Sequence, residues 1–246
     1  KTRPSDLRCF VDTPNIRWFV LRSDSNFVGL GIAGIEDKIP DDIAEAVYLR
    51  QQKVPPQLVA QTLSSEAGFR EATNFRFARV MRLCVHPAAQ RRGFGQKLLD
   101  EMLHCLRQEE VDAVGACFGL KPWLLKLWTN AKTRLVWIAH GSEPSSGHHS
   151  ATVLQPLRPQ CRSLVDRLQE RLMLHLPELL LGPLSQLDLA TIKEVVTALP
   201  SSPLSPSFEA QDKEDVRSFA YGARNLSCCR YALAREVLRL LRNKTT

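Results

Sequence analysis

The chain has 246 residues and a mass of 27.7 kDa, and its hydrophobic content of 44% is enough for one large domain or two smaller ones. The formal charge of +7 and the pI near 9.2 favour an anionic partner, but they do not separate nucleic acid from a nucleotide cofactor. No signal peptide is visible, and no apolar run approaches the roughly 18 residues that span a membrane, so we expect a soluble cytoplasmic protein.

The first elements are expected to be a short amphipathic helix over residues 5–12 and a β-hairpin. Apolar runs at Ile16–Leu21 and Phe27–Ile35 predict the two strands, and the polar link between them has turn composition.

A polar, helix-prone insert follows over residues 36–77. Helical spacing of apolar residues predicts one helix near Ile43 and another near Leu58, separated by Pro55-Pro56. The insert is either a surface decoration or a lid or substrate-binding element beside an active site.

The next stretch combines a strand, a glycine turn and a helix. The apolar run Val80–Val85 predicts a buried strand, which ends at Pro87 because proline cannot donate to a sheet. Residues 90–95 (QRRGFG) then precede apolar residues that recur at helical spacing from Leu98 to Leu106. A glycine turn at a helix N-terminus binds anions through free backbone N–H groups, and Arg91 and Arg92 add positive charge here. The alternative is an ordinary strand-to-helix turn with a chance pair of glycines.

The residues beyond this helix predict an α/β domain with a mixed sheet. We expect strands at 111–118, 135–139 and 150–154, a short aromatic helix at 122–130 and a long polar loop before the last strand.

After residue 157 the composition becomes helical and rich in leucine. Helical periodicity covers 160–181, 186–199 and 211–243, with a Pro/Ser linker at 201–207. Three arginines of the last segment, Arg235, Arg239 and Arg242, fall on one helix face. That face is either a solvated basic surface or an RNA-binding surface.

The seven cysteines are odd in number and have no paired CxxC spacing. Most of them lie in apolar runs, which predicts buried free thiols in a reducing compartment. Without clustered Cys or His, no metal site is expected.

Several stretches together resemble a known family. The turn at residues 90–95 is similar to the pyrophosphate loop of GNAT acetyltransferases, and the wider sequence resembles the acetyltransferase module of TmcA-type tRNA cytidine acetyltransferases. The stretches that carry this resemblance are VPPQLVAQTL, RLCVHPAAQRRGFGQKLLDEML, ACFGLKPWLLKLW, SEPSSGHHSATVLQPL and, more weakly, FAYGARNLSCCRYAL.

The resemblance implies a GNAT acetyltransferase domain over residues 1–157, with the insert at 36–77, and an RNA-binding helical tail over 158–246. Because no G-x-x-x-x-G-K-[ST] loop is present and the chain starts at Lys1, we expect it to be the C-terminal portion of a larger enzyme. That enzyme would use ATP in a helicase-like module ahead of this chain and would bind tRNA and acetyl-coenzyme A.

The resemblance also implies where acetyl-coenzyme A binds. The main chain at the end of the central strand would contact the pantetheine, and the following loop would contact the pyrophosphate. Asn130 replaces an arginine that the family places at the far end of the cofactor. The candidate cofactor-binding residues are Leu83, Cys84, Val85, Gln90, Arg91, Arg92, Gly93, Phe94, Gly95, Gln96 and Asn130.

The candidate reaction is acetyl transfer to the exocyclic N4 amine of a cytidine. This amine is weakly nucleophilic, so a base is expected to accept its proton. Trp123 stands where the family has an acidic residue, and His86 is the candidate base; otherwise His86 is structural or water accepts the proton. Arg76 and Arg79, with the basic tail, are candidate RNA-phosphate contacts. The alternatives are a GNAT enzyme for protein or small-molecule amines and a catalytically inactive module that binds acetyl-coenzyme A or RNA.

Overall fold

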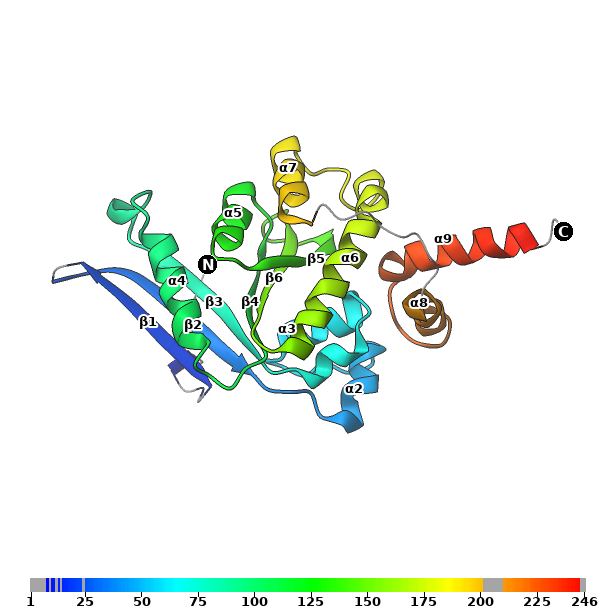
Figure 1. Ribbon diagram of the computed structural model, residues 1–246, viewed down its shortest axis with the longest axis horizontal. Helices are drawn as coiled ribbons and strands as arrows, with labels where there is room; N and C mark the ends of the chain where they lie inside the picture. Colours follow the sequence, from blue (N-terminus) through cyan, green and yellow to red (C-terminus); the bar gives the residue numbers. More distant parts are fainter. Residues whose placement is uncertain are drawn as a thin grey trace.

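The centre of the molecule is a six-stranded mixed sheet with the order β1-β2-β3-β4-β6-β5 (Figure 1). The computed structural model describes residues 8, 10, 11, 13, 15–23, 25–200 and 210–243, with backbone alone for 238–243. The predicted mixed sheet and its six strands are confirmed, whereas the predicted first helix lies largely outside the described residues. The strands are β1 (Ile16–Ser23), β2 (Asn26–Glu36), β3 (Phe77–Val85), β4 (Ala113–Gly119), β5 (Arg134–Ser142) and β6 (His149–Pro156).

The helices lie on both faces of the sheet and beyond its β5 edge. Two of them, α5 and α6, begin with a proline, which has no N–H to satisfy and a φ that suits a first helical residue. The helices are α2 (Asp41–Tyr48), α3 (Leu58–Gln61), α4 (Phe94–Leu106), α5 (Pro122–Asn130), α6 (Pro159–Leu181), α7 (Leu189–Ala198), α8 (Ala210–Tyr221) and α9 (Leu226–Asn243), with short π or 3-10 turns at Thr62–Glu66, Arg70–Asn74 and Pro87–Ala89.

A β-bulge at Met81 changes which face of the sheet the following side chains of β3 point to. The antiparallel register with β2 pairs Ile32 with Arg82 and Ala33 with Val80, so Met81 has no partner there. Val80 lies in the core beside α4 and Leu83 packs against the same core, although the two are three residues apart. Cys84 is consequently exposed, which corrects the expectation of a buried thiol.

The central strands β3 and β4 run side by side for only a short distance. They are parallel and pair at Phe77–Ala113, Ala78–Val114 and Arg79–Gly115. Beyond Gly115, β4 continues to pair with β6 as far as Gly119, while β3 continues to pair with β2 as far as Val85. The two strands therefore part after Arg79.

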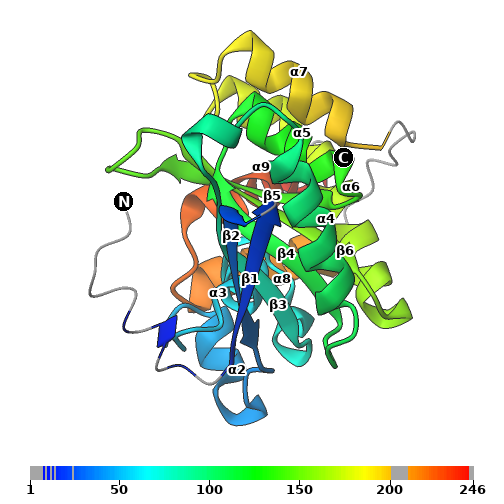
Figure 2. The same cartoon turned by 90° about the vertical axis from the view of Figure 1, so that its left-hand side faces the viewer.

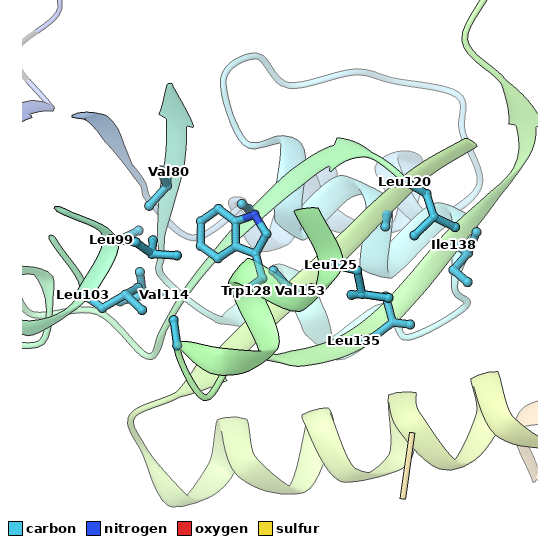
Figure 3. Close-up of a cluster of buried hydrophobic side chains, with 14 of the residues drawn as sticks. Val80, Leu99, Leu103, Val114, Leu120, Leu125, Trp128, Leu135, Ile138 and Val153 are labelled. Atoms are coloured by element: carbon cyan, nitrogen blue, oxygen red, sulfur yellow. The ribbon is translucent and has the colours of Figure 1, made fainter. Parts of the chain in front are cut away.

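One face of the sheet is covered by α4, α5 and α7. Leu99 and Leu103 of α4 are buried against this face, as the helical spacing predicts. Trp128 of α5 is buried and stacks on Phe118, with ring centroids 5.8 Å apart and planes at 11°. Figure 3 shows its indole directed toward Val80 and Leu99. In Figure 2, α7 lies above α5.

The insert between β2 and β3 forms a second core on the other face. Val59, Leu63 and Phe69 of the insert are almost fully buried, and they belong to one cluster with Phe77 and with Leu164 of α6. An element with this much buried apolar surface is part of the folded core. The reading of the insert as a surface decoration is therefore wrong.

The tail packs against both cores. Leu172 of α6 and Val195 of α7 share the first core with the sheet, across the predicted domain boundary at residue 157. The helical stretch predicted over 211–243 is present, but residues 222–225 divide it into α8 and α9. A Cβ at Gly222 would lie 2.6 Å from the backbone oxygen of Ser218, so only glycine fits here, and it would also lie 2.5 Å from Cδ2 of Leu49 in the insert.

The six described cysteines are free thiols, of which Cys105 is exposed like Cys84. Within the described ranges, no three His, Cys, Asp or Glu side chains gather where a metal ion could be held. In the same part of the chain, no helix has the length and apolarity to cross a membrane.

Candidate active site

The end of β3, the following turn and α4 form the candidate cofactor site. Gly93 is the N-cap of α4 and has a left-handed backbone with φ of 82°. Arg91 also has a positive φ, 58°, which is uncommon for a residue with a side chain. No heavy atom lies within 4 Å of where a Cβ of Gly93 would be. The turn is therefore open to a ligand at Gly93.

The first turn of α4 suits an anion. The first N–H groups of a helix have no partner within it, and the first bond here runs from Lys97 N to Gly93 O at 3.0 Å. No acidic residue lies in this turn, and the guanidiniums of Arg91 and Arg92 are exposed. Arg92 lies 5.4 Å from the ring centroid of Phe94. Charge, dipole and open space all favour a phosphate at this position.

The loop before α4 is held by side chains of the candidate site. His86 is exposed, and its Nδ1 accepts a hydrogen bond from Ala88 N at 3.3 Å. Gln90 Nε2 donates to the carbonyl oxygen of Val85 at 2.9 Å. Gln96 Nε2 donates to Asp100 Oδ1 at 3.0 Å. The contacts of His86 and Gln90 hold the turn, whereas the Gln96 contact lies within α4.

The strand end lies beside the gap that opens between β3 and β4. Leu83, Cys84 and Val85 pair with β2, and the register with β4 stops at Arg79. The edge of β3 that faces away from β2 therefore has no strand partner along residues 80–85 and can accept an extended ligand. The structure thus brings this strand end and the turn at Gln90–Gln96 together.

The geometry agrees with comparisons to known proteins. Residues 1–108 match the family model "GNAT acetyltransferase 2". The chain is 32% identical to the tRNA(Met) cytidine acetyltransferase TmcA of Nitrosococcus halophilus over 93% of this chain and 31% of the relative. It is 30% identical to the TmcA of Actinobacillus pleuropneumoniae over 96% of this chain and 38% of the relative.

The matched residues 1–108 are similar to the GNAT acetyltransferases, and the chain has the GNAT fold. The resemblance to the C-terminal portion of TmcA-type proteins is confirmed, and the chain spans about a third of the length of these two relatives. Among solved structures, NAA60 of Arabidopsis thaliana in complex with acetyl-CoA aligns with 64% of this chain and 85% of its own, at 13% identity and a TM-score of 0.44.

Two residues of α5 bear on the GNAT site. Asn130 is the last residue of this helix and is exposed, whereas Trp123 lies in the first turn with 65% of its surface exposed. The first turn follows the end of β4, so Trp123 lies at the end of the sheet where β3 and β4 part.

Three of the five candidate RNA-binding arginines have partners within the chain. Arg76 donates from Nε to Asp37 Oδ1 at 2.8 Å and from Nη1 to the carbonyl oxygen of Glu110 at 2.9 Å. Arg235 donates to the hydroxyl of Tyr231 at 3.3 Å and lies 3.6 Å from Asp212. Arg79 is paired as described next, and the side chains of Arg239 and Arg242 lie outside the described residues.

A buried ion pair joins β2 and β3 where the central strands part. Arg79 Nε pairs with Glu36 Oε1, and the two side chains are 16% and 2% exposed. Glu36 Oε2 also accepts a hydrogen bond from Val59 N at 2.9 Å, which ties the insert to the sheet. Burial raises the pKa of Glu36, and the Arg79 guanidinium opposes that shift. Sequence reasoning missed Glu36 as a site residue. Its only sequence signal is that it is an acidic residue directly after an apolar stretch predicted as a buried strand.

Proposed function

We propose that this chain transfers an acetyl group from acetyl-coenzyme A to the N4 amine of a cytidine in tRNA. The observation that carries the proposal is the parting of β3 and β4 after Arg79 and Gly115, beside the open N-terminus of α4. The TmcA relatives support tRNA cytidine as the acceptor, since their names state that activity.

We propose that acetyl-coenzyme A lies along the end of β3 and the following turn. Main-chain groups of Leu83, Cys84 and Val85 contact the pantetheine, and the turn from Gln90 to Gln96 contacts the pyrophosphate. The residues present fit such a group, because Gly93 leaves open space and α4 carries no acid in its first turn. Asn130 is the proposed contact farthest along the cofactor.

The cofactor, when bound, supplies an acetyl thioester whose C–S bond breaks as the C–N bond to cytidine forms. The amine releases one proton and the leaving thiolate takes up one, so the reaction balances without a further reactant. The chain positions the reacting groups, and free N–H groups along β3 polarise the acetyl carbonyl.

The proton acceptor is a separate part of the proposal. His86 stands beside the turn, but its Nδ1 already accepts the Ala88 amide, so in the neutral ring Nε2 carries the proton. We therefore propose that His86 shapes the turn and that water accepts the amine proton.

We also propose that the complete protein binds tRNA and contains the ATP-dependent, helicase-like module ahead of this chain. Arg76, Arg79, Arg235, Arg239 and Arg242 remain the proposed RNA contacts, with the internal partners described above for the first three.

Radiolabelled acetyl-coenzyme A tests this proposal. The complete protein, supplied with ATP, should move label to tRNA and not to a lysine peptide. Label on the peptide without RNA would overturn tRNA as the acceptor, and binding without transfer would indicate an inactive module.

A further inference from the structure

A cavity of about 540 Å³ lies between the insert and β3. Arg50, Lys53 and Arg79 contribute cationic side chains to its lining, and Pro55, Pro56 and Leu58 contribute apolar surface. Its volume falls within the range of about 300–1,000 Å³ that is typical of ligand-binding pockets.

The position of the cavity relates it to the cofactor site. Arg79 lines the cavity and is also the last residue of β3 that pairs with β4. Val80, the next residue, faces the opposite side of the sheet and packs in the core with α4. The cavity and α4 therefore lie on opposite faces, at the level where the two strands begin to part.

The charges of the cavity favour an anionic ligand over a cationic one. Arg50 is neutralised by Glu66, at 2.7 Å, and Arg79 by Glu36. Lys53 is exposed and forms no ion pair with another described residue, so its charge is available to a ligand. With Arg50 and Arg79 paired, the charge of Lys53 remains, so a nucleotide phosphate would be attracted and a lysine side chain would be repelled.

The wall of the cavity is held in place by the tail. Arg224 donates to the carbonyl oxygens of Ser65, at 3.1 Å, and Glu66, at 3.3 Å. Cys228 Sγ donates to Glu66 Oε2 at 3.2 Å. Residues that line the cavity are thus fixed from outside it, which is the condition for binding with little loss of entropy.

We propose that this cavity binds the acceptor nucleotide of the RNA, an inference that rests on the proposed function. The base lies against the apolar wall of Pro55, Pro56 and Leu58, and Lys53 contacts a neighbouring phosphate. Acetyl-coenzyme A held on the α4 face reaches this nucleotide through the gap between β3 and β4.

Two substitutions test the cavity in the complete protein. Leu58→Trp fills it, and because Leu58 is 43% exposed the larger ring does not have to enter the core. Lys53→Gln removes the unpaired charge. The matched controls lie on α7, where Leu189→Trp and Lys193→Gln change exposed residues of the same type outside the cavity.

Leu58→Trp should lower kcat/KM for tRNA acetylation by about tenfold or more, as expected when a bound group loses its pocket. It should leave the thermal shift produced by acetyl-coenzyme A unchanged. Lys53→Gln should lower the slope of log affinity for RNA against log salt by about 1. The control variants should match the wild type in all three measurements.

The outcomes separate this inference from the proposed function. If the wild type acetylates no tRNA, the proposed function fails. If the wild type acetylates tRNA and both cavity variants behave like their controls, only the cavity assignment is overturned. If the wild type acetylates a peptide and Leu58→Trp blocks that transfer, the occupant of the cavity is a peptide and not a nucleotide.

Discussion

Arg224, in the turn between α8 and α9, donates from Nη1 to Asp215 Oδ1 at 2.5 Å, and both side chains are fully buried. The same guanidinium contacts the hydroxyl of Tyr48, at 3.2 Å, in the insert. Because Arg224 also donates to the carbonyl oxygens of Ser65 and Glu66, one buried arginine connects the α8–α9 turn with the wall of the cavity.

Arg224→Ala should lower the free energy of unfolding by about 3 kcal/mol, the low end for a broken buried pair, because the buried Asp215 carboxylate loses one of its two arginine partners and keeps Arg171. Urea denaturation measures the change. Arg217→Ala, at an exposed position of the same segment, is the control and should alter stability by less than about 0.5 kcal/mol. Equal effects of the two substitutions would show that the buried pair is not important for stability.

Stability should fall in acid because of His175. Burial lowers its pKa to about 2 in the folded protein, and its ring lies 4.1 Å from that of Tyr231. The unfolded chain takes up a proton near pH 6.5 and the folded chain does not, so this contribution is complete above pH 6.5 and is lost as pH falls toward 2. In this range, His175 makes the free energy of unfolding fall by up to about 1.4 kcal/mol for each pH unit.

His175→Phe keeps an aromatic ring beside Tyr231 and removes the titrating group. Denaturation at pH 4, 5, 6 and 7 should show that the free energy of unfolding of this variant depends less steeply on pH than that of the wild type. Part of the remaining pH dependence comes from His140, whose pKa is also lowered by burial. His104→Gln, at an exposed position of α4, is the control and should leave the slope unchanged. An unchanged slope in His175→Phe would contradict this assignment.

Gly93→Glu should abolish stabilisation by acetyl-coenzyme A. At about 100 times its dissociation constant, the cofactor should stabilise the wild type by about 2.7 kcal/mol. A carboxylate at Gly93 would repel the pyrophosphate and strain a backbone with φ of 82°. Gly141→Glu, where a Cβ also meets open space, should retain the ligand-induced shift in a thermal denaturation experiment. A shift of the same size in Gly93→Glu would place the cofactor elsewhere.

His86→Asn should retain acetyl transfer. An asparagine oxygen can accept the Ala88 amide as His86 Nδ1 does, so the turn keeps its shape. Loss of a general base typically costs about 10²–10⁴-fold in rate, whereas we expect less than about tenfold. The pH profile of kcat/KM is the second measurement, and disappearance of an ionisation from that profile in the variant would identify His86 as the base.

Local signals explain which elements the sequence predicts well. Pro122 marks the start of α5, the glycine turn and apolar spacing mark α4, and the polar link marks the hairpin of β1 and β2. Each of these signals acts over a few residues, and such local signals are enough to predict the strands and most helices of the fold.

Long-range contacts explain what the sequence leaves out. Arg224 bonds to Ser65, 159 residues away, and local periodicity cannot distinguish such an arginine from a solvated one. The bulge at Met81 exposes Cys84, and no pattern in the apolar run of β3 marks that extra residue. The cavity arises from an insert that folds back onto β3, so its residues gain a common role only in three dimensions.

The most direct measurement is nucleoside analysis of tRNA by mass spectrometry after incubation with the complete protein, ATP and acetyl-coenzyme A. We predict N4-acetylcytidine with the wild type and its loss with Gly93→Glu. Unmodified cytidine in every sample, although acetyl-coenzyme A binds at the β3–α4 turn, would contradict the proposed reaction.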